Sequence, residues 1–146
     1  MRLHIDIDSN IQESSITIQA SEIDDKLKSI IEFIEQTTKP KQINGRRDKD
    51  IHLINLDKVY RFYIEDKILT METKEGKYIV DQRLYQIEKI ITKSFIKISK
   101  SEIVNLDYVD HLSFTNTGHV QIFIKNGVFT YSSRRYLKDI KERLNL

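Results

Sequence analysis

Residues 120–132 have the sequence VQIFIKNGVFTYS, and this stretch decides the fold. Apolar and polar residues alternate on both sides of Asn126-Gly127, as they do in strands that bury one face. Asn-Gly is the dipeptide favoured in a type I′ turn, because both central positions of that turn need positive φ. The stretch therefore predicts an antiparallel β-hairpin with its turn at Asn126-Gly127.

Short apolar runs separated by turn residues continue upstream of this hairpin. The glycine of Lys74-Glu75-Gly76 predicts a second hairpin loop, and a turn is expected at Asn116-Thr117-Gly118. Apolar residues at intervals of three and four predict short helices over 84–91 and 136–146. The chain has 24 Ile and one Ala, which favours strands. We therefore expect a mostly β (α+β) fold, with strands over 51–55, 59–64, 68–73, 77–80, 95–99, 103–109 and 112–115.

The N-terminal part of the chain has a different pattern. Alternating apolar and polar residues predict two half-buried strands, over 3–7 and 16–18. Ser21 is a candidate N-cap, and the apolar stripe that follows it predicts an amphipathic helix over 21–36. This part is expected to form a small strand-strand-helix segment.

Residues 37–50 contain a proline, a glycine and a basic cluster but no clear periodicity, which indicates a linker. A chain of 146 residues is expected to hold one domain, or one domain with a small appendage. We therefore predict an N-terminal segment with its linker over residues 1–44, with a dimerisation or regulatory role, and a larger domain over residues 45–146.

The charge is segregated along the chain. Residues 1–36 carry three basic and eight acidic side chains, a balance of −5, whereas residues 37–146 carry 21 basic and 14 acidic side chains, a balance of +7. A basic body favours a polyanionic partner such as a nucleic acid. A merely solvated basic surface is the alternative that composition leaves open.

Motifs for catalysis or metal binding are missing from the sequence. The chain has no Cys, which excludes thiol chemistry, and its four His have no metal-ligand spacing. Paired carboxylates fall at turns or helix starts, and the glycine-rich phosphate motifs are absent. We expect no enzyme activity, cofactor, metal or small-molecule substrate. A small enzyme built from distant carboxylates and His is the weaker rival.

The sequence also bears on location. No apolar run approaches the roughly 18 to 20 residues that a membrane span needs. The N-terminus alternates Ile with Asp instead of presenting an uncharged apolar stretch. Together with the absence of Cys, this pattern leads us to expect a cytoplasmic protein.

Basic residues fall where the predicted strands turn or end. Side chains at such tips project from a sheet, where Lys and Arg can neutralise phosphates or donate to guanine O6 and N7. Neighbouring serines could donate to phosphates as well. The candidate DNA-binding residues are Lys67, Lys97, Ser99, Lys100, Ser101, Ser133, Arg134 and Arg135.

Two of these segments resemble a known family. FIKISKSEIVNLDYV at residues 95–109, followed by the hairpin and by YSSRRYLKDI at residues 131–140, resembles the signature of the LytTR DNA-binding domain. The resemblance covers about residues 45–146, and the chain as a whole resembles the stand-alone bacterial LytTR transcriptional regulators. It implies a mostly β domain that binds imperfect direct repeats in duplex DNA, with loop side chains in successive major grooves.

The resemblance also implies residue roles. The three principal loop contacts of the family would fall on Lys67, Lys100 and Arg135. The first position is often His and the second often Asn, and both are Lys here, so phosphate contact is the expected role for both lysines. Arg135 is the expected base reader, because a guanidinium can donate twice to guanine. The alternative is that Arg134 and Arg135 divide phosphate and structural roles.

Other residues are expected to serve the fold or a partner. Asn105 is expected to stabilise a turn or cap within the fold. The aromatic residues Tyr60, Phe62, Tyr63 and Phe95 are expected in the core and not on a base-stacking surface. The apolar stripe over 21–36 motivates the hypothesis of a homodimer. A membrane-protein regulator is implied by the resemblance alone. The alternative function is a protein-binding module that uses the basic face for an acidic partner.

Overall fold

The N-terminal unit consists of one helix and an extended segment. The computed structural model describes residues 1–38 and 41–146, and the chain forms two compact units, one on each side of the gap. The helix of the first unit is α1 (Asp25–Thr38). The Asp24 side chain accepts a hydrogen bond from the backbone N–H of Leu27 at 2.7 Å. Asp24 therefore caps the helix, and the expected cap at Ser21 is wrong.

The two predicted N-terminal strands are not formed. Residues 1–24, all of which the structure describes, contain no strand. Leu3, Ile5 and Ile7 are 84%, 68% and 89% exposed, and the apolar residues of 16–18 are exposed too. An alternating pattern becomes a strand only where a neighbour supplies ladder hydrogen bonds and an apolar surface. The first unit offers neither to these residues.

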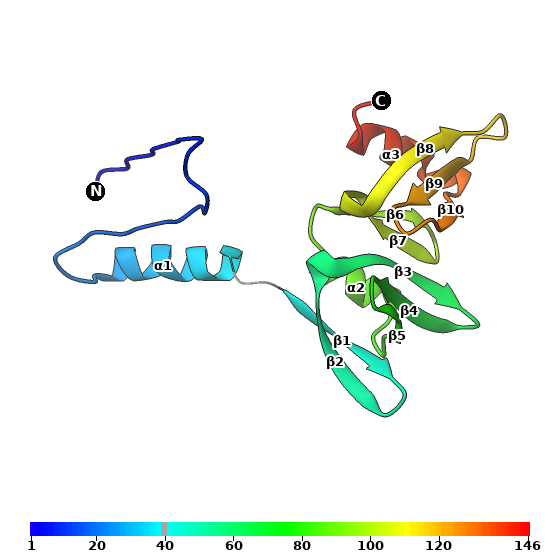
Figure 1. The fold of residues 1–146 in the computed structure, drawn as a ribbon, viewed down its shortest axis with the longest axis horizontal. Helices are drawn as coiled ribbons and strands as arrows, with labels where there is room; N and C mark the ends of the chain where they lie inside the picture. The colour runs from blue at the N-terminus through cyan, green and yellow to red at the C-terminus, as the bar shows by residue number, and fades with distance from the viewer. Residues whose placement is uncertain (39–40) are drawn as a thin grey trace. The chain divides into compact units, whose positions relative to one another are not determined.

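The second unit contains two antiparallel sheets (Figure 1). The seven-stranded sheet has the order β2-β1-β5-β4-β3-β7-β6, and the three-stranded sheet has the order β10-β9-β8. Figure 1 shows the three-stranded sheet near β6 and β7, far from the β1–β2 hairpin. The strands are β1 (Gln42–Arg47), β2 (Asp50–Asn55), β3 (Val59–Glu65), β4 (Ile68–Thr73), β5 (Gly76–Ile79), β6 (Phe95–Ser99), β7 (Glu102–Asn105), β8 (Val109–Phe114), β9 (Val120–Ile124) and β10 (Phe129–Tyr131).

Short helices connect and cover these strands. The helix α2 (Leu84–Ile90) lies between β5 and β6, and α3 (Leu137–Arg143) ends the chain, as the apolar spacing predicted. Single 3₁₀ turns are η1 (Leu56–Lys58), η2 (Leu106–Tyr108) and η3 (Arg134–Tyr136). The predicted mostly β class with short helices is confirmed.

Strand β1 corrects the expected linker over residues 37–50. Gln42–Arg47 pairs with β2 along its whole length and meets β5 at Arg46 and Ile79. A Cβ added at Gly45 would lie 2.8 Å from Met71 Cε and 2.9 Å from Tyr78 Cβ. Gly45 therefore permits close packing of β1 against the core. Of the expected linker, Lys39 and Pro40 lie outside the described residues.

The β6–β7 hairpin contributes to both hydrophobic cores of the second unit. Phe95 and Ile103 face the first core, which α2 covers with Leu84 and Ile87. The alternate residues of the same strands face the second core, together with β8, β9 and α3: Ile96, Ile98 and Val104. Burial on both faces explains why these strands have nearly continuous apolar sequences.

One hairpin turn differs from expectation in type. The β9–β10 loop lies at Asn126-Gly127 as predicted, but the residues with positive φ include Gly127 (85°) and not Asn126. Gly127 N–H donates to Ile124 O at 2.9 Å, which makes a three-residue loop with Gly in the left-handed region. The predicted type I′ turn at Asn-Gly is therefore wrong. Two consecutive positive φ values occur instead at Asp66 (51°) and Lys67 (66°).

Candidate nucleic-acid interface

The tips that carry Lys67 and Lys100 lie at the same end of the seven-stranded sheet. Strands β3 and β7 are antiparallel neighbours, so the β3–β4 turn and the β6–β7 turn lie side by side at the same end of these strands. Ile64 N–H donates to Ser101 O at 3.0 Å, which joins the two turns directly. The side chains of Lys67 and Lys100 are both exposed.

The segment with the two arginines is attached to the same end of the sheet. Ser133 N–H donates to Ile98 O at 2.9 Å, next to the β6–β7 turn. The turn η3 begins one residue later and leaves Arg134 and Arg135 exposed. The structure thus brings together three segments that are distant in sequence, at residues 65–67, 99–101 and 133–135. We call them the three tips.

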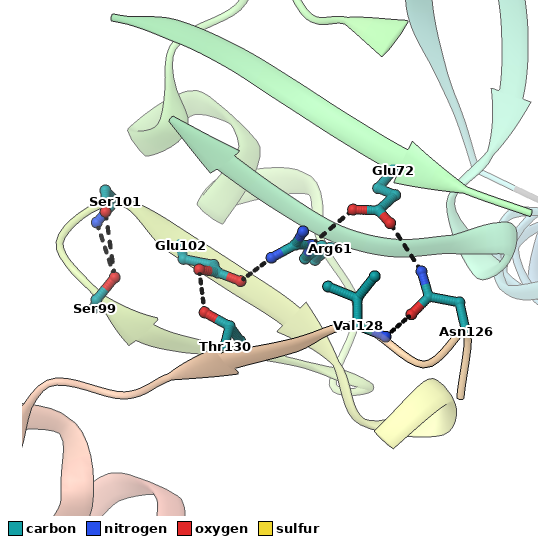
Figure 2. Close-up of polar contacts among 8 residues, drawn as sticks. All are labelled: Arg61, Glu72, Ser99, Ser101, Glu102, Asn126, Val128 and Thr130. Carbon is teal, nitrogen blue, oxygen red and sulfur yellow. Dashed lines mark hydrogen bonds and ion pairs between the residues drawn. The ribbon is translucent and has the colours of Figure 1, made fainter. Parts of the chain in front are cut away.

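Two of the candidate serines, Ser99 and Ser101, shape the β6–β7 turn through their own hydrogen bonds. Ser99 Oγ accepts from the backbone N–H of Ser101 at 3.2 Å and lies 3.4 Å from Ser101 Oγ (Figure 2). These bonds close the β6–β7 turn around Lys100. Ser133 is half-buried, and its neighbour Ser132 is buried, with its Oγ accepting from Val120 N–H at 3.1 Å.

Lys97 differs from the other candidates, because its charge is already paired with an acidic side chain of the same unit. Its Nζ lies 2.8 Å from Glu88 Oε1 on α2. The hydrogen bond to Glu88 raises the pKa of Lys97 above its usual value. Lys97 lies in the body of β6, so the structure does not bring it to the tips as it does Lys67, Lys100 and Arg135.

A polar network with a buried centre lies between the two sheets, and the sequence did not predict it. Arg61 on β3 donates from Nε to Glu72 Oε2 at 2.8 Å and from Nη1 to Glu102 Oε2 at 3.2 Å (Figure 2). Thr130 Oγ1 on β10 donates to Glu102 Oε1 at 2.7 Å, and Asn126 Nδ2 donates to Glu72 Oε1 at 2.8 Å. We call these five residues the Arg61 network.

The charges at the centre of this network interact strongly, because burial removes the screening by water. The side chains of Arg61, Glu72 and Glu102 are only 12%, 9% and 12% exposed. Burial would lower the pKa of Arg61, but the hydrogen bonds and charges of the two glutamates outweigh it and raise that pKa. Burial raises the pKa of Glu102, although Thr130 and Arg61 act in the opposite direction. Arg61 therefore stays charged between two acidic partners.

The aromatic residues divide between core and surface. Phe62 and Phe95 are buried with ring centroids 5.9 Å apart, as expected of core residues. Tyr63 is half-buried beneath Arg61, whose guanidinium carbon lies 4.2 Å from the ring centroid. Tyr60 is half-buried against the ring of Tyr108 at 4.6 Å. The two phenylalanines confirm the expectation fully and the two tyrosines in part.

A row of rings covers the outer face of the three-stranded sheet, and the sequence analysis missed it. His111 stacks on Phe123 with centroids 4.1 Å apart. Phe123 meets Phe129 at 5.8 Å, and Phe129 meets Tyr131 at the same separation. The signal was available, since alternation around the hairpin places Phe129 and Tyr131 on one face.

Within residues 1–38 and 41–146, no group of three or more His, Cys, Asp or Glu side chains could hold a metal ion. No helix in these ranges is long and apolar enough to cross a membrane.

Comparison with known proteins finds similar sequences and a similar fold. The family model described as LytTr DNA-binding domain matches residues 49–145. An uncharacterized HTH-type transcriptional regulator of Staphylococcus aureus strain NCTC 8325 is 41% identical over 146 residues, which are 100% of this chain and 99% of that protein. A similarly described protein of strain MRSA252 is 40% identical over the same coverage. The LytTr DNA-binding domain of a putative methyl-accepting/DNA response regulator from Bacillus cereus has a similar fold, with a TM-score of 0.69, 18% identity and coverage of 74% of this chain and 99% of that chain.

Proposed function

Because the chain belongs to the LytTR family of DNA-binding domains, we propose that it is a bacterial transcriptional regulator that binds specific sites in duplex DNA through its three tips. The family consists of DNA-binding domains and not of enzymes, and the named relatives are described as transcriptional regulators. A regulator of this kind acts on the bacterial chromosome, so we place it in the cytoplasm.

The observation that carries this proposal is the meeting of the three tips at one end of the sheet. Two backbone hydrogen bonds hold them there, from Ile64 N–H to Ser101 O and from Ser133 N–H to Ile98 O. Exposed basic side chains then project from neighbouring turns. This arrangement suits a groove of duplex DNA, whose phosphates flank the base edges.

We assign different roles to the basic residues of the tips. Arg135 contacts a base, because its planar guanidinium can donate twice to guanine O6 and N7. Lys67 and Lys100 contact phosphates, because an ammonium group acts as a point charge with little base preference. Ser99 and Ser101 shape the β6–β7 turn, and the one hydroxyl proton that their mutual hydrogen bond leaves free is donated to a phosphate. Ser133 and Arg134 contact the DNA phosphate backbone, next to the base that Arg135 contacts.

We propose that loops recognise the DNA and that no recognition helix is used. The relatives are named HTH-type regulators. In this chain α2 and α3 have only seven residues each, and the strands β6 to β10 separate them. The family resemblance implies a direct repeat as the site, and we propose that the tips of one molecule enter the major groove at each half.

The N-terminal unit has a different proposed role. Its charge is acidic, which opposes contact with DNA phosphates. Half-buried Ile30, Ile31 and Ile34 leave an apolar stripe on α1. We propose that this stripe pairs with a second copy and so supplies one domain for each half of the repeat. A membrane protein that restrains the regulator is proposed from family resemblance alone.

Selection of bound duplexes from a random pool tests the function. The proposal predicts enrichment of a two-part repeat, with affinity that falls steeply as salt rises. Failure to retain any duplex at low salt would contradict it and leave a protein-binding module as the better account. Turnover of a substrate that is insensitive to loss of Lys67, Lys100 and Arg135 would indicate an enzyme instead.

A further inference from the structure

We propose that the Arg61 network is a positioning device that fixes strand β10, and with it Arg135, relative to the other two tips. This inference deepens the proposed function and rests on it. The five residues come from four strands and one loop: β3, β4, β7, β10 and the β9–β10 loop. None of them lies in the three tips.

The contacts of the network tie the β9–β10 hairpin to the seven-stranded sheet at two places. Asn126 in its loop donates to Glu72 on β4, and Thr130 in its second strand donates to Glu102 on β7. Arg61 joins the two glutamates (Figure 2). Each glutamate therefore uses one oxygen for Arg61 and the other for the hairpin.

The position of β10 decides where Arg135 lies. Only four residues separate Thr130 from Arg135, and the chain between them is fixed again at Ser132 and Ser133. Glu102 directly follows Ser101 of the β6–β7 turn. The Thr130–Glu102 bond therefore links the strand that leads to Arg135 with the turn that carries Lys100. Base contacts need such fixed geometry, because a misplaced guanidinium loses its paired hydrogen bonds.

A purely structural role is the competing explanation, and removing Arg61 would not separate the two. That change would leave two buried carboxylates without a cation, which is strongly destabilising. The outer members of the network allow finer substitutions. Thr130→Val keeps the shape of the side chain but removes the donor to Glu102. Asn126→Asp keeps the Oδ1 that accepts from Val128 N–H at 3.0 Å but replaces the donor to Glu72 with a second carboxylate, so it adds like-charge repulsion to the loss of the hydrogen bond.

The first experiment measures the position of Arg135 relative to the seven-stranded sheet, without DNA, in the chain of residues 1–146. The protein has no Cys, so spin labels attach only at introduced cysteines. One label replaces Arg135, and the other replaces Lys74 on the exposed β4–β5 turn, at the opposite end of β4 from the tips. We expect a narrow distance distribution that broadens in Thr130→Val and in Asn126→Asp. Thr130→Ser retains the hydroxyl and should restore the narrow distribution. Ser113→Ala, an exposed change on β8 outside the network, is the control.

The second experiment asks whether the network acts through Arg135. Thr130→Val should lower the affinity ratio between the selected duplex and random duplex by about tenfold, within the range that one bidentate base contact supplies. In an Arg135→Ala background the same change should have no further effect on the ratio, since the contact is already lost.

The outcomes separate the inference from the proposed function. Unchanged distance distributions in both network variants would overturn the inference, as would equal losses of specificity with and without Arg135. A wild-type protein that prefers no duplex would overturn the proposed function, while the distance measurement would still decide whether the network positions Arg135.

Discussion

Arg135 and the two tip lysines differ in the hydrogen bonds that they can offer to DNA, and this difference gives the first prediction. Arg135→Ala should cost about 1–3 kcal/mol of discrimination between specific and random duplex. Lys67→Ala and Lys100→Ala should lower the affinity for specific and random duplex by similar factors. Each should also reduce the slope of log affinity against log salt concentration by about one. Binding titrations at several salt concentrations measure both quantities. If Arg135→Ala lowered the affinity for specific and random duplex by the same factor, the assigned roles would be contradicted.

The raised pKa of Glu102 gives a prediction about stability and pH. Because the folded-state pKa lies above the unfolded value, the stabilisation linked to this group is complete below the unfolded pKa. It is lost as the pH rises through the folded pKa. The stability of the wild type relative to Glu102→Gln should therefore fall as the pH rises through that window. Chemical unfolding of both proteins across the pH range measures this difference in the free energy of unfolding. A difference that grows with pH would show that the pKa is lowered.

The Thr130 hydroxyl lowers the pKa of Glu102, so its removal has a further expected effect. Thr130→Val should raise the pKa of Glu102 above the wild-type value, because a hydrogen bond to the charged form is lost. Titration of the carboxyl carbon by NMR measures this shift. Thr130→Ser is the control and should keep the wild-type pKa. A lower pKa in Thr130→Val would contradict the observed bond.

Individual side chains were predicted from the sequence where their role is local. Lys67 was placed at a tip, and Asn105 was expected to stabilise a turn. The structure shows Asn105 Oδ1 accepting from Asp107 N–H at 3.1 Å. Its second bond, from Nδ2 to Val59 O at 2.9 Å, spans 46 positions and could not be predicted. The contacts of Arg61 with Glu102 and of Lys97 with Glu88 likewise depend on strands and helices that meet only in the fold.

At the scale of elements, strand β1 depends on a glycine. Gly45→Ala should destabilise the protein by about 1–3 kcal/mol, because the added Cβ would overlap the side chains of Met71 and Tyr78. Equilibrium unfolding in denaturant measures the change. Asn44→Ala, an exposed neighbour on the same strand, is the matched control and should have a small effect. A neutral Gly45→Ala would show that β1 lies farther from the core.

Elements whose apolar residues recur at a regular spacing were predicted well. Elements whose formation depends on a neighbouring strand were not. Most strands from β2 to β10 and both short helices lie close to their predicted ranges. The strand expected over 103–109 is wrong in part, because β7 ends at Asn105, the turn η2 follows, and β8 already begins at Val109. Strand β1 was missed because its inward positions are Ile43 and Gly45, which give one apolar residue and no alternation. The segments 3–7 and 16–18 have the alternation but lack a partner strand. Periodicity indicates what a segment could bury, and the rest of the fold decides whether it is buried.

At the scale of the whole molecule, the stripe on α1 predicts assembly. Ile34→Glu should reduce a dimeric mass to the monomeric mass, because a charge on the stripe opposes its burial. Gln36→Glu adds the same charge at an exposed position and should leave the mass unchanged. Sedimentation with and without the selected duplex measures assembly. A wild type that is monomeric in both conditions would contradict the proposed homodimer.

The central claim is that the three tips form one DNA-binding surface, and NMR titration of the labelled protein with its selected duplex tests it most directly. The account predicts amide shifts concentrated at residues 65–67, 99–101 and 133–135, with the amides of α2 and of the β1–β2 hairpin nearly unchanged. Shifts centred on α2, on the aromatic row of the three-stranded sheet or on the β1–β2 hairpin, with the tips unaffected, would contradict it.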